Sequence, residues 1–81
     1  MNITGQVVVS KFVSNTEIGL VVKTNHGRIP LIMSSQDYDK LVMYSKTSLF
    51  GEEVDIFSDK NGFFVSVNGE SPISINPVEV N

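Results

Sequence analysis

The sequence predicts a mainly β fold: a small five-stranded barrel with one helix and an extended C-terminal arm. Segments rich in β-branched and aromatic residues, bounded by turn residues, occur at residues 5–12, 16–24, 28–33, 52–58 and 63–68. The only segment with apolar residues at helical spacing, residues 34–46, lies between the third and fourth of these. A length of 81 residues leaves room for one domain. We expect the domain to cover residues 1–70 and the arm residues 71–81.

The second and third predicted strands form a hairpin joined at residues 25–27. We expect a two-residue turn at His26 and Gly27, because it pairs Val22 with Leu31 and leaves one continuous apolar face. The opposite face of this hairpin then carries two cations close to its tip, Lys23 and Arg28.

The helix has its start signal at Ser34, whose hydroxyl can accept a hydrogen bond from a free amide of the first turn. Asp37, three residues on, is an imperfect capping-box partner. Apolar residues at helical spacing predict the buried stripe, Tyr38, Leu41, Val42 and, beyond the helix end, Leu49. The helix is therefore expected to cover one end of the barrel, not to stand free as a recognition element.

The fourth and fifth predicted strands form a second hairpin around residues 59–62. Pairing Ile56 with Val65 sets the aliphatic residues on the inner face and places Phe57 opposite Phe64 on the outer face. Two carboxylates share that outer face, Glu53 and Asp55. The two rings either form an exposed anchor for a partner or pack beneath the C-terminal arm. In the arm, apolar and polar residues alternate after Pro72, which is typical of an extended segment.

Composition and charge restrict the classes of function that the protein can have. The net charge is −3, which argues against a protein whose affinity comes mainly from neutralising phosphates. Residues 1–36 carry a net charge of +2 and residues 37–81 a net charge of −5, so two surfaces of opposite sign are expected. The chain lacks cysteine, which excludes disulfides and thiolate-bound zinc and favours a reducing compartment, the cytoplasm. No apolar run approaches the length of a membrane span, and no signal-like segment is present at the start of the sequence, so a soluble protein is expected.

The residues offer little for catalysis. His26 is the only histidine and lies in a predicted turn, where a role in backbone geometry or contact is the simpler interpretation. Glu52, Glu53 and Asp55 are close in sequence, but Glu52 points to the other side of the strand, and their spacing matches no calcium loop. We interpret them as a solvated acidic face. The expectation is a protein that is not an enzyme and has no cofactor or metal.

Several segments resemble the S1-type OB fold over residues 5–67. They are Gly5-Gln6-Val7-Val8-Val9, the hairpin through Gly27 into Ile29-Pro30-Leu31-Ile32, the helix start at Ser34-Ser35, and Gly51-Glu52-Glu53-Val54. The resemblance implies a small OB-like barrel that binds single-stranded RNA across its second and third strands through stacked aromatic residues and cations. The alternative architecture is a six-stranded or SH3-like barrel. Where the OB family has aromatic residues on those strands, this chain has aliphatic ones, Ile18, Leu20, Val21 and Ile32.

Two functional hypotheses follow. The first is a regulatory or inhibitory protein-binding module that engages a basic protein, for example one that binds nucleic acid, through an acidic and aromatic surface, Glu53, Asp55, Phe57 and Phe64. The second is a weak binder of single-stranded nucleic acid through Lys11, Lys23, His26 and Arg28. We favour the first because base stacking contributes about 1 to 3 kcal/mol per base and the stacking residues are missing. A homodimer through an edge strand or the C-terminal arm is compatible with either.

Overall fold

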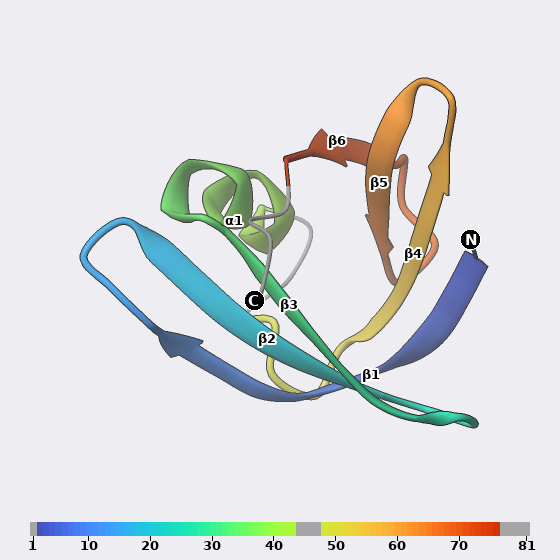
Figure 1. The fold of residues 1–81 in the computed structure, drawn as a ribbon, viewed down its shortest axis with the longest axis horizontal. Helices are drawn as coiled ribbons and strands as arrows, with labels where there is room; N and C mark the ends of the chain where they lie inside the picture. Colours follow the sequence, from blue (N-terminus) through green and yellow to red (C-terminus); the bar gives the residue numbers. More distant parts are fainter. Residues whose placement is uncertain (1, 44–47, 77–81) are drawn as a thin grey trace.

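The computed structural model describes residues 2–43 and 48–76. In this part of the chain, one antiparallel sheet in the order β3-β2-β1-β4-β5-β6 curls into a half-barrel with one helix on its concave side (Figure 1). The elements are β1 Asn2–Phe12, β2 Glu17–Thr24, β3 Gly27–Ser34, α1 Ser35–Val42, β4 Glu53–Asp59, β5 Gly62–Val67 and β6 Ile73–Ile75. The mainly β class and the barrel-like curvature are confirmed. The expected number of five strands is wrong, because the described residues form six.

The sixth strand comes from the segment that was expected to be an extended arm outside the barrel. Ile73–Ile75 pairs antiparallel with β5, with Phe64 opposite Ser74, so this segment extends the sheet. The alternation of apolar and polar residues explains why this segment joins the sheet. Ile75 adds to the buried face and is only 2% exposed. The remainder of the predicted arm, residues 77–81, lies outside the described residues.

Strand β1 joins the two halves of the sheet. It begins at Asn2, earlier than predicted, and pairs with β4 through Gln6 before pairing with β2 from Gln6 onward. Its register on β2 shifts between Val7 and Val9, which marks a bulge at the run of valines. Because one strand serves both halves, the sheet turns a corner here, and we refer to the segment around Gly5 as the β1 corner.

The β2–β3 hairpin differs from its predicted register by two residues. Thr24 pairs with Gly27, so the turn residues are Asn25 and His26, and Val22 lies opposite Ile29. Gly27 takes a φ of 119°, a value that favours glycine, and the Thr24 hydroxyl donates to the Gly27 carbonyl oxygen at 2.8 Å. An even shift keeps every side chain on its predicted face, so the continuous apolar face is retained.

The β4–β5 hairpin has the predicted register. Ile56 lies opposite Val65 and Phe57 opposite Phe64. The turn is shorter than expected, because Asp59 pairs with Gly62 and only Lys60 and Asn61 remain between them. The aliphatic residues of both strands face the concave side and enter the core.

The core lies between this concave face and the helix. Its buried apolar members are Val7, Ile18, Leu20, Val22, Leu31, Met33, Leu41, Leu49, Val54, Ile56, Val65, Val67 and Ile75. Tyr38 and Val42 pack against it, which confirms the predicted helix stripe. The N-cap is also confirmed, since the Asp37 amide donates to Ser34 Oγ at 3.1 Å. The helix ends at Val42, before the predicted end at residue 46, and residues 44–47 lie outside the described residues.

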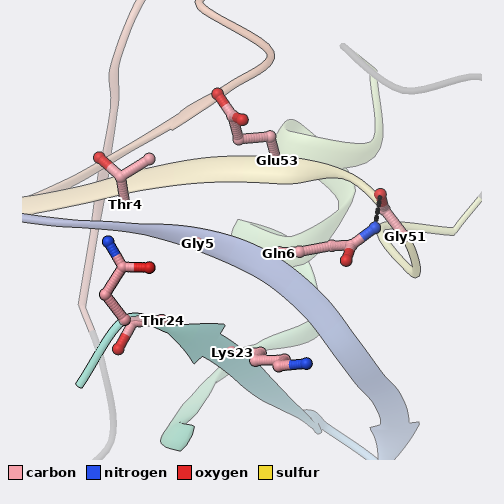
Figure 2. A pocket seen from close by; sticks show the side chains of 8 residues that line it. Thr4, Gly5, Gln6, Lys23, Thr24, Gly51 and Glu53 are labelled. Carbon is pink, nitrogen blue, oxygen red and sulfur yellow. Dashed lines mark hydrogen bonds between the residues drawn. The ribbon is translucent and has the colours of Figure 1, made fainter. Parts of the chain in front are cut away.

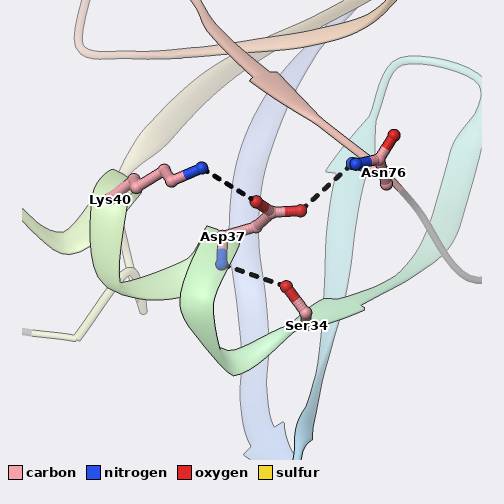
Figure 3. Close-up of polar contacts among 4 residues, drawn as sticks. All are labelled: Ser34, Asp37, Lys40 and Asn76. Atoms are coloured by element: carbon pink, nitrogen blue, oxygen red, sulfur yellow. Dashed lines mark hydrogen bonds and ion pairs between the residues drawn. The ribbon is translucent and has the colours of Figure 1, made fainter.

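Asp37 links helix α1 to the chain at the end of β6 (Figure 3). Its Oδ2 accepts a hydrogen bond from the Asn76 amide at 3.1 Å, just beyond β6, and its Oδ1 pairs with Lys40 Nζ at 3.4 Å. The side chain does not return to the Ser34 amide, as a complete capping box requires, and the residue is only 7% exposed. Asp37 therefore holds β6 and α1 together.

Replacing Asp37 with alanine is expected to lower the free energy of unfolding by about 1 to 3 kcal/mol, because the Asn76 amide loses its acceptor. Amide exchange at residues 74–76 should accelerate more than exchange in β1. The matched control is Asp39→Ala, an exposed carboxylate in the same helix, which should change stability by less than about 0.5 kcal/mol. Equal exchange rates in the two variants would contradict a link between Asp37 and β6.

Candidate functional site

The outer face of β4 and β5 carries an aromatic pair. Phe57 and Phe64 lie directly opposite each other, with ring centroids 5.4 Å apart and ring planes 17° apart, which is a stacked arrangement. Neither ring belongs to the core cluster, and both are half-buried. The pair therefore stabilises the hairpin while presenting apolar surface on the convex side of the sheet.

Two carboxylates continue the same face along β4. Glu53 is exposed, and Asp55 is half-buried, with its Oδ1 accepting a hydrogen bond from Thr4 Oγ1 at 2.6 Å. Residues two apart on a strand share a face, so β4 brings its three outward residues into one row. We call Glu53, Asp55, Phe57 and Phe64 the aromatic–acidic patch. The structure places together all four residues that the sequence predicted for protein binding.

Up to Asn76, the C-terminal segment does not cover the rings of Phe57 and Phe64. β6 is hydrogen-bonded to the edge of β5, which places Ser74 beside Phe64 in the sheet. The segment between β5 and β6 approaches the convex face at Ser66 instead, whose hydroxyl donates to the Glu70 carbonyl oxygen at 2.5 Å. Ser66 is consequently only 6% exposed. This segment forms one border of the patch.

Three of the four residues predicted for nucleic-acid binding lie together at the β2–β3 hairpin tip. Lys23 and Arg28 are cross-strand neighbours on the convex side, and His26 occupies the turn. Lys11 lies apart, since it pairs with Gly19, four residues along β2 from Lys23, or about 13 Å at the usual rise of a strand. Within residues 2–43 and 48–76, neither Lys23 nor Arg28 forms an ion pair.

Two hollows beside the hairpin tip were not predicted from the sequence. The larger, about 470 Å³ in volume, opens on the convex side between Thr4, Gln6 and Glu53 on one wall and Lys23 and Thr24 on the other (Figure 2). The second, about 420 Å³, opens on the concave side and is lined by Asn2, Ile3, Thr4, Thr24, Asn25, His26 and Ile29. The two hollows arise because β2 no longer pairs with β1 beyond Lys23, where the chain turns toward β3. The alternation of polar and apolar residues from Asn2 to Thr4 is the sequence signal that would have extended β1 to this place.

In the described part of the chain, no three histidine, aspartate or glutamate side chains gather closely enough to hold a metal ion. The structure also contains, in those residues, no helix that is long and apolar enough to cross a bilayer.

No protein-family model matches the chain, and comparisons with curated proteins and with solved structures likewise found no match. The class to which the geometry assigns the chain is a small antiparallel β half-barrel with a helix on its concave face. Function must be inferred from the patch on the convex face and from the grooves at the hairpin tip.

Proposed function

We propose that the protein is a non-catalytic regulatory or inhibitory module that binds a basic protein through the aromatic–acidic patch. The observation that carries the proposal is the stacked pair Phe57 and Phe64, held outside the core and flanked along β4 by Asp55 and Glu53. Aromatic side chains on a rigid sheet lose little conformational entropy on binding and contribute strongly to interfaces. The half-barrel presents them on strands whose register is fixed by the core.

Electrostatics favour a basic partner. Glu53 of the patch and Asp59, further along β4, are exposed. The cations near this surface are Lys60 in the β4–β5 turn and Lys23, which lines the same hollow as Glu53. Partners that carry arginine and lysine for nucleic acid would match such a surface, and occupation by the patch would compete with their ligand. The proposal therefore includes inhibition of a nucleic-acid-binding protein in the cytoplasm.

Affinity capture from a lysate of the source organism tests the class of partner. We expect a basic protein to be retained after nuclease treatment and released as ionic strength rises toward about 1 M, where the Debye length is only about 3 Å. The control bait is Glu53→Gln with Asp55→Asn, which keeps a hydrogen-bond acceptor for Thr4 and removes both charges. Equal retention by the two baits, or loss of all retention with nuclease, would contradict the proposal.

A second candidate function has its own supporting observation. Lys23 and Arg28 lie opposite each other at the hairpin tip without an ion pair in the described residues, and His26 is beside them. Such a cluster suits phosphate groups of a single strand, as an OB-like barrel would use it. The hairpin there offers aliphatic residues in place of a stacking platform, which is why this function ranks second. Partners that disappear on nuclease treatment would favour it.

A further inference from the structure

The edge of β1 facing the hairpin tip is unpaired over residues 2–5. β1 pairs with β4 along Asn2–Gln6, but its pairing with β2 begins only at Gln6, opposite Lys23. Continuing that register would place Thr4 opposite Asn25, where β2 has already turned away. This part of β1 therefore has a partner strand on one side and a groove on the other.

The direction of the peptide groups follows from the ladder. The Val7 amide donates to the Glu52 carbonyl oxygen at 2.9 Å, so Val7 directs its backbone groups toward the β4 side. Successive residues of an antiparallel strand alternate between the two sides. Ile3 and Gly5 consequently face β4, while Asn2 and Thr4 direct their N–H and C=O groups into the groove. No backbone hydrogen bond in the described residues occupies those groups on that side.

The two hollows flank this open edge, one on each face of the sheet. Thr4 and Thr24 line both of them, so the hollows meet at the gap between β1 and the hairpin tip. On the concave side the gap is floored by the side chains of Ile3 and Ile29. On the convex side it is bordered by Lys23 (Figure 2). A strand placed there would direct alternate side chains to an apolar floor and to a cationic border.

The charges at the border indicate which side chains the groove accepts. Lys23 and Arg28 are directly opposed across the hairpin, an arrangement of like charges that destabilises a strand pair. Arg28 lies on β3, one strand further from the groove, so a carboxylate in the groove would contact Lys23 and offset the repulsion at that cation. Glu53 on the far wall belongs to the aromatic–acidic patch and forms no ion pair with either cation.

We infer that the gap between β1 and the β2–β3 tip is a strand-addition site for an extended peptide with alternating apolar and acidic residues. The peptide pairs with the free backbone groups of Thr4 and Asn2. Its apolar side chains lie between Ile3 and Ile29, and its acidic side chains face Lys23. This site adjoins the aromatic–acidic patch, since Glu53 lines its far wall, but it takes a partner of opposite charge.

The test removes one amide proton from the open edge. The probe is the capped peptide Gly-Glu-Val-Glu-Val-Glu-Gly, titrated by NMR to about 1 mM, the range of weak peptide affinities. We expect shifts at residues 2–6 and 23–29 and slowed exchange of the Thr4 amide. Thr4→Pro should weaken binding about fivefold to tenfold, since it removes one main-chain donor on the groove side. Thr4→Val, which lacks the hydroxyl but keeps the amide, should bind about as well as the wild type.

Three outcomes would overturn the inference. The first is the absence of shifts at the highest peptide concentration. The second is equal binding by Thr4→Pro and Thr4→Val when both give native spectra. The third is binding of a single-stranded RNA oligonucleotide that displaces the peptide and is insensitive to Thr4→Pro, which would assign the tip to nucleic acid. If Thr4→Pro does not fold, a backbone ester in place of the Thr4 amide removes the same donor and decides between these outcomes.

Discussion

We expect Gly5→Ala to lower the free energy of unfolding by at least about 3 kcal/mol, the upper range for added atoms in a packed interior. A Cβ at Gly5 would lie 2.4 Å from the Lys23 carbonyl oxygen and 2.7 Å from Val22 Cγ1. The oxygen belongs to the backbone of β2 and cannot move aside without shifting that strand. Since a chain of this length is stable by only about 4 to 12 kcal/mol, the loss is a large part of the total.

Urea unfolding followed by circular dichroism measures this effect, with Gly19→Ala as the matched control. A Cβ at Gly19 would come within 2.9 Å of Val13 Cγ1, but Val13 is an exposed side chain that can rotate away. The control should therefore cost about 1 kcal/mol or less. Equal losses for the two variants would contradict the close crossing of β1 and β2 at the β1 corner.

The double variant Phe57→Ala with Phe64→Ala is expected to have the largest effect on binding. Truncating two central aromatic anchors should weaken the partner by about thirtyfold or more, since an interface hot spot contributes at least about 2 kcal/mol. The stability cost should stay near 1 to 3 kcal/mol, about what the loss of one half-buried stacked pair implies. The affinity of the captured protein, measured by calorimetry beside thermal unfolding of each variant, separates the two effects.

The chain offers a matched control in two phenylalanines elsewhere. Phe12 is 70% exposed and Phe50 is 62% exposed, so both present more ring surface than the stacked pair. Phe12→Ala with Phe50→Ala should leave the affinity unchanged. An equal loss in both double variants would indicate general apolar adhesion. Failure of the Phe57 and Phe64 variant to fold would show that the pair serves the core and would remove the proposed anchor.

The parts of the fold that neighbouring residues encode were predictable from sequence. Ser34 caps the helix because a hydroxyl and a free amide three residues apart meet in any helix start. The register of β4 on β5 follows from a short turn and from alternation, and it brought Phe57 and Phe64 together as predicted. Register on one face is strongly specified when that face is buried.

The parts that depend on distant segments were not predictable. Ile73–Ile75 was expected in an extended arm and not in the sheet, because three alternating residues do not reveal whether an edge is available to pair with them. The β1 corner forms because one strand pairs first with β4 and then with β2. No local sequence pattern around Gly5 predicts this. The contact of Asp37 with the Asn76 amide joins residues 39 positions apart. The grooves at the hairpin tip follow from the corner and were missed with it.

The most direct test of the protein-binding function is an NMR map of the chain in complex with the basic protein that it captures. The proposed function predicts the largest shifts in residues 53–57 and at Phe64, on the convex face of β4 and β5. Residues 23–28 should shift little, because the hairpin tip carries the opposite charge. Largest shifts at Lys23, His26 and Arg28, with the aromatic–acidic patch unaffected, would contradict the account.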